Sequence, residues 1–428
     1  MIALDCGHSE EPSQTGCCEH LVGSDDAPHY RLLRGRGIES DLICEECEKA
    51  WTAGTPVELR SVCLACARRY PGYETWDLLG WRGEPQVLER PEDIGLEELA
   101  RLEAKPASDR SISPLRDGWL VLTEANELVR FTEDGGVVAR RMVTIPGKDA
   151  AHEQPLALHA SDAGDFAAVV RDRGRNGMIL SVADGHEILA LDRGSYHNEQ
   201  TQFPCAFVEV DGRTVVVAAS DWNRVDAFDP RTGACLSPRS PTRYSKGEPR
   251  PEHYLDYFYG PLLVSPNGRW IVTNGWVWHP VGVPRVWDVR RWLTENVWES
   301  EDGPSVVRLA QRAYDWGRPM SWIGDDLIAL SRIGWDDEVM LQGVMVYQRG
   351  ADERWTGFAG PEGQMWSDDR RLFVATPSGL EVWDPFSGER LGQLGIQVHA
   401  YNPHLRELAG VEPATGTILR WRLASGAE

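Results

Sequence analysis

From residue 111 to its end, the sequence repeats one short pattern seven times. Each copy has a polar turn, an apolar run, a loop, and a second run that ends in an aromatic residue or valine. The 318 residues of this segment give about 45 residues per copy. The first runs, which we expect to be the inner strands, are residues 119–123, 166–170, 214–218, 270–273, 327–330, 372–375 and 407–411. The second runs end near Phe131, Val182, Phe228, Trp287, Tyr347, Trp383 and Trp421.

The repeated runs are short, rich in β-branched and aromatic residues, and bounded by turn residues. This composition is typical of β-strands, and helical periodicity is nearly absent from the segment. A unit of two or more strands cannot bury both of its own faces, so successive units must stack around a ring or along a line. The pattern therefore predicts a mostly β fold.

Two copies carry the dipeptide Trp-Asp after the second run, as Trp287-Asp288 and Trp383-Asp384, and Phe228-Asp229 is a variant. In these features the segment resembles the WD-repeat β-propeller family, although the Gly-His dipeptide that precedes blades in that family is missing. The resemblance implies a seven-bladed β-propeller over residues 111–428. The alternative is a β-sandwich with additional strands.

The last expected strand, Ile418–Leu423, ends five residues before the end of the sequence, so the seventh blade lacks an outer strand. Propellers often close by borrowing this strand from the N-terminal side, which removes a free sheet edge. Gln86–Glu89 or Ser111–Ser113 could supply it. Between them, the apolar spacing of Ile94–Lys105 predicts a short helix, so residues 76–110 are expected to form a linker with a helix and a possible closing strand.

Cysteines are concentrated at the N-terminus, where seven of nine lie before residue 67. Cys44 and Cys47 form one C-x2-C pair, and Cys63 and Cys66 form another after 15 intervening residues. Two thiolates at this spacing occupy one edge of a tetrahedron, and two such pairs complete it. The spacing predicts a zinc site.

A second set of possible ligands lies upstream, as Cys6-x-His8 and Cys18-x-His20, with Cys17 as a spare or alternative ligand. Two wirings are open. In the sequential wiring, the four upstream ligands bind one zinc ion and the four downstream cysteines bind another. In the crossed wiring, each Cys-x-His pair joins one of the C-x2-C pairs.

Residues 1–75 are therefore expected to form a small module with one or two structural zinc ions, because protein side chains fill all four positions of each set. The arrangement resembles RING-like and treble-clef zinc modules, which implies protein docking. It departs from the RING pattern in its Cys-x-His pairs and in the 23 residues between His20 and Cys44.

The formal net charge is −22, and only four of the 44 basic residues are lysines. A surface that follows phosphates needs clustered basic residues, so neither nucleic acid nor an anionic membrane is expected as a partner. The sequence has no apolar run long enough for a transmembrane helix and no signal peptide at its start. We expect a cytoplasmic, bacterial protein.

Sequence motifs of catalysis are missing, including the nucleophile elbow, the phosphate-binding P-loop, the H-E-x-x-H zinc motif and the dinucleotide-binding glycine loop. Carboxylates are plentiful, but no spacing singles out an acid–base pair. The protein is therefore more readily understood as a non-enzymatic one, with a hydrolase in the propeller channel as an alternative.

In WD-type propellers, the loops between the two middle strands and the connections between blades share one rim. Aromatic residues are abundant in these loops, and they can anchor a partner because they bury a large area at low entropic cost. The residues expected to bind a partner are Trp222, Tyr254, Tyr257, Trp276, Trp278, His279 and Trp335.

These features together predict an interaction scaffold, in which the zinc module and the propeller each dock a protein or peptide within a larger complex. The main alternative is a RING-like transferase adaptor, whose zinc module would recruit a carrier-loaded enzyme while the propeller selects the target.

Overall fold

The structure is a computed structural model that describes residues 14–21, 30–34, 40–52, 55, 57–63, 87–145, 154–240, 244, 247–337, 340–350 and 355–423. The chain forms two compact units. The N-terminal unit comprises residues 1–86 with the short segments 311–313 and 334–341, and the propeller unit comprises the rest.

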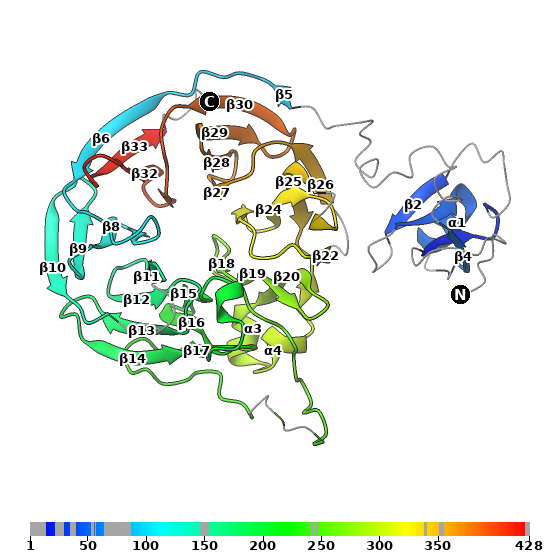
Figure 1. Ribbon diagram of the computed structural model, residues 1–428, viewed down its shortest axis with the longest axis horizontal. Helices are drawn as coiled ribbons and strands as arrows, with labels where there is room; N and C mark the ends of the chain where they lie inside the picture. Colours follow the sequence, from blue (N-terminus) through cyan, green and yellow to red (C-terminus); the bar gives the residue numbers. More distant parts are fainter. Residues whose placement is uncertain are drawn as a thin grey trace. The chain divides into compact units, whose positions relative to one another are not determined.

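The propeller unit consists of seven β-sheets arranged in a ring (Figure 1), which confirms the predicted seven-bladed β-propeller. Neighbouring strands within each blade run antiparallel along the chain. The first blade contains β7 (Ile112–Leu115), β8 (Gly118–Leu122), β9 (Glu127–Thr132) and β10 (Val137–Met142). The second contains β11 (Leu156–Ala160), β12 (Phe166–Arg171), β13 (Asn176–Ser181) and β14 (Glu187–Asp192).

The third blade departs from the four-stranded pattern, and the fourth carries two helices between its last two strands. The third has β15 (Cys205–Val210), β16 (Arg213–Asp221) and β17 (Arg224–Phe228), and a single bridge between Phe228 and Cys235 stands at its outer edge. The fourth has β18 (Leu262–Val264), β19 (Trp270–Val277), β20 (Val281–Asp288) and β21 (Val307–Arg308), with helices α3 (Val289–Thr294) and α4 (Glu299–Asp302) between the last two strands. The other short elements of residues 87–423, where described, are the 3-10 helix η2 (Asn198–Gln200) and strand β22 (Arg312–Ala313), which lies in a segment of the N-terminal unit.

The last three blades complete the ring. The fifth has β23 (Met320–Ile323), β24 (Leu327–Ile333), β25 (Leu341–Gln348) and β26 (Trp355–Ala359). The sixth has β27 (Gln364–Ser367), β28 (Leu372–Thr376), β29 (Gly379–Asp384) and β30 (Glu389–Leu394), and the seventh has β31 (Ala400–Asn402), β32 (Glu407–Val411) and β33 (Ile418–Leu423).

Each blade has one strand that lies closer to the centre of the ring than the strand predicted to be innermost. The runs expected to be inner strands are the second strands, and β7, β11, β15, β18, β23, β27 and β31 lie inside them around the axis. Two of these innermost strands, β18 and β31, escape sequence analysis because they have only three residues each.

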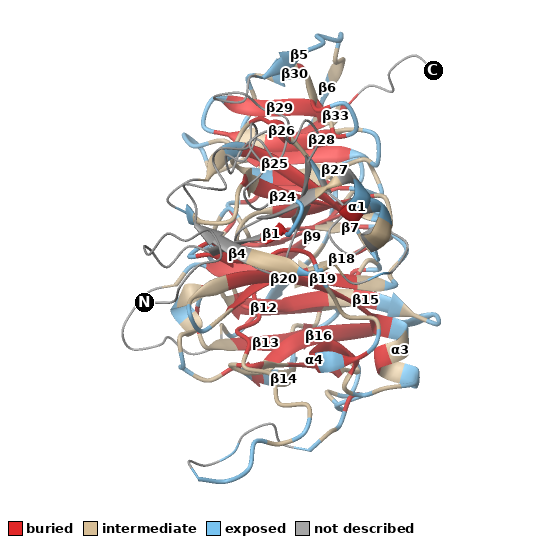
Figure 2. Ribbon diagram, turned by 90° about the vertical axis from the view of Figure 1, so that its right-hand side faces the viewer, coloured by how far each residue is buried: buried red, intermediate tan, exposed pale blue. Residues whose placement is uncertain are grey.

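Apolar side chains fill the space between successive blades. Ala168 and Val170 of the second blade, for example, share a cluster with Val216 and Ala218 of the third. Figure 2 shows that buried residues follow the strands through the whole unit. Each blade therefore depends on its neighbours for burial, as the repeat predicts.

The predicted helix at Ile94–Lys105 is wrong, because this segment contains strand β6 (Leu96–Leu102). It pairs antiparallel with β33 and completes the seventh blade. The open edge of β33 offers a row of unpaired backbone groups, and pairing with that edge overrides the local preference for a helix.

Neither segment proposed as a closing strand joins the seventh blade. Residues 112–115 form β7 of the first blade. Strand β5 (Leu88–Glu89) pairs in parallel with β30 and so extends the sixth blade.

A buried ion pair lies where the ring closes. The Arg420 guanidinium contacts the Glu407 carboxylate at 2.9 Å, and both side chains are almost completely buried. Arg420 also donates to the carbonyl oxygens of Ala100 in β6 and of Glu133 in the first blade, and Trp119 donates to Glu407. This network joins the seventh blade, the closing strand and the first blade.

The described residues of segment 14–63 in the N-terminal unit form a four-stranded sheet and one helix. Its elements are β1 (Gln14–Cys18), β2 (Tyr30–Arg34), β3 (Ser40–Cys44), α1 (Glu45–Thr52) and β4 (Leu59–Cys63). The strand order is β2-β3-β1-β4, in which β1 is parallel to β3 and antiparallel to β4. Among the described residues of both units, no helix is long and apolar enough to cross a membrane.

Candidate functional site

One candidate site is a cluster of four metal-ligand residues in the N-terminal unit, Cys18, His20, Cys44 and Cys47. Their ligand atoms all lie within 4.8 Å of one another. His20 Nδ1 is 3.2 Å from the Cys47 sulfur and 3.5 Å from the Cys44 sulfur.

The sheet brings these residues together. Strands β1 and β3 run parallel with Cys17 opposite Leu42, so Cys18 and Cys44 end neighbouring strands at the same edge. His20 follows in the turn after β1, and Cys47 lies in the first turn of α1, which begins directly after Cys44. The Cys-x2-Cys pair thus lies next to a Cys-x-His pair that follows from a separate strand.

The donor set fits zinc. Thiolate and imidazole ligands bind zinc at about 2.3 and 2.0–2.1 Å in a tetrahedron, so ligand atoms around one ion are separated by about 3.5–3.8 Å. The separations from His20 to the two sulfurs are close to these values. All four positions would be filled by protein side chains, which is typical of a structural ion.

The two thiols of the C-x2-C pair are unequal. Burial alone would raise the pKa of Cys44, but hydrogen bonds from the Cys47 amide and the neighbouring ligand groups outweigh it and lower the pKa to about 7. Burial and the adjacent thiols raise the pKa of Cys47 to about 12. A cation among these groups would favour the thiolate form of both.

Of the two wirings, the grouping of Cys18 and His20 with Cys44 and Cys47 corresponds to the crossed one. Cys17 is not a member of the cluster, because adjacent residues of a strand point to opposite faces. Cys6, His8 and Cys66 lie outside the described residues, as does the side chain of Cys63, which leaves the second predicted zinc site a prediction.

A second candidate site is an aromatic pocket on the propeller unit, with a volume of about 670 Å³. It is lined by Arg175, Gly194, Ser195, Tyr196, Asp221, Trp222, Tyr244 and Tyr254. These residues come from the turns after β12 and β16 and from the connections that join the second, third and fourth blades. The sequence analysis predicts that loops of these two kinds lie on one rim of the propeller.

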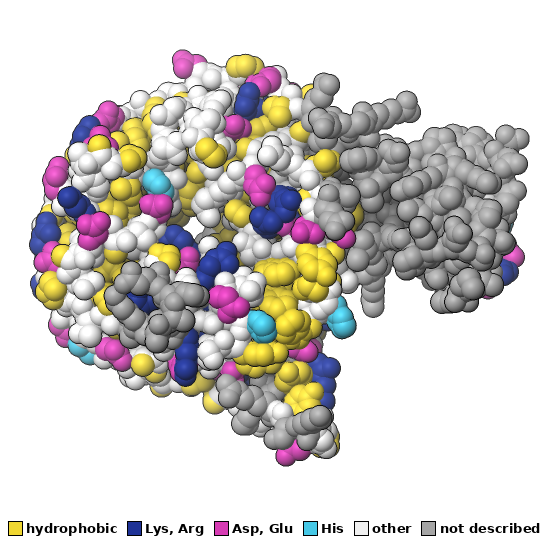
Figure 3. Space-filling view, viewed as in Figure 1, with side chains coloured by type: hydrophobic (Ala, Val, Ile, Leu, Met, Phe, Trp, Pro, Cys, Tyr) yellow, Lys and Arg dark blue, Asp and Glu magenta, His cyan; other side chains and the backbone are white. Residues whose placement is uncertain are grey.

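A network of aromatic rings extends from the pocket across the neighbouring blade. Tyr196 contacts Trp222, and Trp222 contacts Phe258, with ring centroids 5.2 and 4.7 Å apart. Phe258 stacks on Trp276 at 4.1 Å, and the exposed Trp278 lies 5.1 Å from Trp276. Figure 3 shows hydrophobic side chains gathered on this face over β19 and β20.

The structure brings together some of the residues predicted to bind a partner. Trp222 and Tyr254 line the pocket half-buried, and Trp278 and His279 are exposed in the turn between β19 and β20. Trp335 is half-buried in the segment 334–341, which belongs to the N-terminal unit.

Two predicted anchors are wrong, because Tyr257 and Trp276 are buried with exposed fractions of 1% and 2%. The Tyr257 hydroxyl donates to the Val283 carbonyl at 2.9 Å, so this side chain holds β20 in place. Trp276 is stacked between Phe258 and Trp316. Both residues support the surface from below without being available to a partner.

The sequence analysis missed Tyr196 and His197, in the connection from the second to the third blade. Tyr196 is 48% exposed, and the ring of His197 lies 4.9 Å from that of Trp278. The sequence analysis expects aromatic residues in the connections between blades to bind a partner, and the same expectation applied to this connection would have identified both residues.

The charges at the pocket are largely compensated. Arg175 binds both oxygens of Asp192 at 2.6 and 2.5 Å. Asp221 accepts a hydrogen bond from the backbone of Trp222 at 2.8 Å. Burial raises the pKa of Tyr254 to about 12, with a smaller effect from Asp256.

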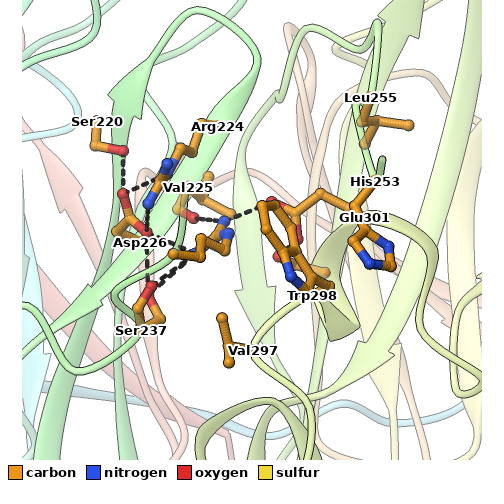
Figure 4. Close-up of polar contacts among 12 residues, drawn as sticks. Ser220, Arg224, Val225, Asp226, Ser237, His253, Leu255, Val297, Trp298 and Glu301 are labelled. Atoms are coloured by element: carbon orange, nitrogen blue, oxygen red, sulfur yellow. Dashed lines mark hydrogen bonds and ion pairs between the residues drawn. The ribbon is translucent and has the colours of Figure 1, made fainter. Parts of the chain in front are cut away.

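The connection that carries Tyr244 and Tyr254 is fixed by a buried arginine. Arg239 binds Asp226 of β17 at 2.6 Å and Glu301 of α4 at 2.5 Å, and all three side chains are almost completely buried. It also donates to the Val225 carbonyl at 2.8 Å. Figure 4 shows the two carboxylates on either side, with Trp298 beside Glu301.

We expect Arg239→Lys to destabilise the propeller by about 1–3 kcal/mol, because an ammonium group cannot replace the planar set of donors that reaches both carboxylates. Urea unfolding followed by circular dichroism measures this loss. The exposed Arg231 offers a matched control, and Arg231→Lys should leave the midpoint unchanged. Equal midpoints for both variants would contradict the role of Arg239.

Comparison with known proteins identifies no family for this chain. No protein-family model and no curated protein matches the chain, so the resemblances to WD-repeat proteins and RING-like modules stay predictions. A solved structure that is similar is the β-propeller domain of Cps50 (Swd1) from Myceliophteria thermophila, at 12% identity and TM-score 0.46, over 78% of this chain and all of that one.

Two further similar structures are BamB from Moraxella catarrhalis and hydrazine synthase from Kuenenia stuttgartiensis. BamB is 11% identical with a TM-score of 0.44, over 78% of this chain and 99% of that one. Hydrazine synthase is 11% identical with a TM-score of 0.48, over 74% and 96%. At these identities the likeness indicates no particular function.

Proposed function

We propose that this protein is a non-enzymatic interaction scaffold whose propeller docks a protein or peptide through the aromatic pocket. The observation that carries the proposal is the gathering of half-exposed rings from separate loops around one cavity. Trp and Tyr are enriched among residues that dominate binding energy, because they bury a large area at low rotamer entropy.

The layers beneath the pocket support this role. Trp276 and Phe258 are stacked under the surface, and their backbones are joined by two hydrogen bonds of 2.8 and 3.0 Å. This pairing ties the connection between the third and fourth blades to β19. A rigid surface loses little entropy on binding, so more of the contact energy appears as affinity.

The N-terminal unit would serve as a second docking module held together by zinc. In this proposal Cys18, His20, Cys44 and Cys47 bind one ion, and Cys6, His8, Cys63 and Cys66 bind a second in the crossed wiring. Because thiolate ligands require reduced cysteines, the proposal places the protein in the cytoplasm.

The expected result of a Trp222→Ala/Trp278→Ala double substitution is loss of partner binding with the fold retained. Removing two anchors should weaken binding at least about 30-fold, since one such residue contributes about 2 kcal/mol or more. The full chain would be used to capture and identify partners in the native host, and affinity would then be measured with the purified partner.

Phe386 provides the matched control, as an exposed aromatic residue in the turn between β29 and β30. Phe386→Ala should bind the partner as the unsubstituted chain does. If the double variant keeps full affinity while its circular dichroism is unchanged, the pocket is not the docking site.

A further inference from the structure

We propose that the aromatic pocket binds an extended, proline-rich segment of the partner, an inference that rests on the proposed docking function. Such segments adopt the polyproline II conformation, with three residues per turn and no internal hydrogen bonds. They are recognised in grooves lined by aromatic side chains.

The rings of the pocket form two nearly perpendicular pairs. Tyr196 and Trp222 meet at an interplanar angle of 75° with centroids 5.2 Å apart, and Tyr244 and Tyr254 meet at 89° and 5.0 Å. A pair of rings at such an angle forms a notch with two apolar walls. The compact, flat ring of proline suits this kind of notch, because it offers apolar surface without a rotatable side chain.

Each open side-chain hydrogen-bonding group of the pocket can donate a hydrogen bond, although the hydroxyls can also accept one. Within the described part of the chain, five such groups have no hydrogen-bond partner: the hydroxyls of Ser195, Tyr196, Tyr244 and Tyr254, and the indole N–H of Trp222. The nearby carboxylates are engaged, since Asp192 binds Arg175 and the Gly194 amide.

A proline-rich segment is the complement of this arrangement. Proline lacks the backbone N–H and keeps its carbonyl, so the segment presents acceptors and few donors. The Trp222 indole only donates, so a carbonyl oxygen of the segment would satisfy it, and the tyrosine hydroxyls can donate to further carbonyls.

Charge argues against the other occupants. A cationic side chain would stack on an aromatic face, but the guanidinium of Arg250 already lies 4.8 Å from the centre of the Tyr254 ring. An anionic group would need an available arginine, but Arg175 is bound to both oxygens of Asp192. The pocket is thus suited to an uncharged ligand.

The test measures binding of fluorescein-labelled decaproline to the full-length chain by fluorescence anisotropy. We expect it to bind at least tenfold more tightly than a labelled Gly-Ser decapeptide. Trp222→Ala should weaken decaproline binding at least tenfold, and Phe386→Ala should leave it unchanged. Equal binding of the two peptides, or tighter binding of a peptide containing trimethyllysine, would overturn the proposal.

Tyr254→Phe separates hydrogen bonding from packing, because it keeps the ring and removes only the hydroxyl. We expect a severalfold loss of decaproline affinity with an unchanged unfolding midpoint. If affinity is also unchanged, the donor argument is wrong. If decaproline fails to bind while Trp222→Ala/Trp278→Ala still abolishes partner capture, the proline inference fails and the proposed docking function stands.

Discussion

Substitution of Cys44 by serine in the full-length chain is expected to unfold the N-terminal unit and leave the propeller folded. Serine is a poor zinc ligand, so the cluster of Cys18, His20 and Cys47 would lose its fourth bond. Binding of a structural zinc ion contributes about 10–16 kcal/mol to the folding of small domains. A unit this small has little other core to compensate, because small domains bury a low fraction of their surface.

Metal content and limited proteolysis measure the outcome. The unsubstituted chain should contain zinc and resist protease, whereas Cys44→Ser should lose at least one zinc ion and be cleaved before residue 87. Two matched controls are available in Cys235, which is exposed in the propeller unit, and Cys17, which lies outside the cluster. Cys235→Ser and Cys17→Ser should both keep their zinc, and a Cys44→Ser protein with unchanged zinc content would contradict the assignment.

The zinc ligands show what spacing can and cannot predict. Cys44 and Cys47 are neighbours because three residues make about one helical turn, which any reader of the sequence can see. Their meeting with Cys18 and His20 depends on β1 lying parallel to β3. Such pairing between distant strands leaves no mark in local spacing, so the sequence left two wirings open.

The repeat was predictable because its second strands are apolar runs, such as β8, and its third strands end near an aromatic residue or valine, as β9 does at Phe131. The closing strand was not, since Leu96, Leu99 and Leu102 have a spacing that also fits a helix. The exposed edge of β33 decides in favour of a strand over a helix, and this edge exists only in the assembled ring.

Exposure of the aromatic residues was only partly predictable. Trp276 and Trp278 are two residues apart and would share a face if both lay in a strand. Strand β19 ends at Val277, however, so Trp278 begins the turn and is 40% exposed. The buried Arg239 was missed for a different reason, since charged residues are rarely buried unless they are paired and the sequence does not show its partners.

Glu407→Ala is expected to destabilise the propeller strongly, because Glu407 lies in the network that closes the ring. This substitution leaves Arg420 buried without its counter-charge and removes the acceptor of the Trp119 indole. Breaking a buried pair in this way costs about 3–5 kcal/mol. Urea unfolding of the full chain should show this loss as a lower midpoint of the propeller transition.

Asp117 provides the control, because its carboxylate, which pairs with Arg130, is exposed, and a pair at the surface contributes less than about 1 kcal/mol. Asp117→Ala should therefore leave the midpoint nearly unchanged. The comparison tests closure specifically, since Arg420 also holds the Ala100 carbonyl of β6. If Glu407→Ala unfolds at the same urea concentration as Asp117→Ala, the ring does not depend on this network, and the pairing of β6 with β33 and the apolar contacts between the first and seventh blades suffice to close it.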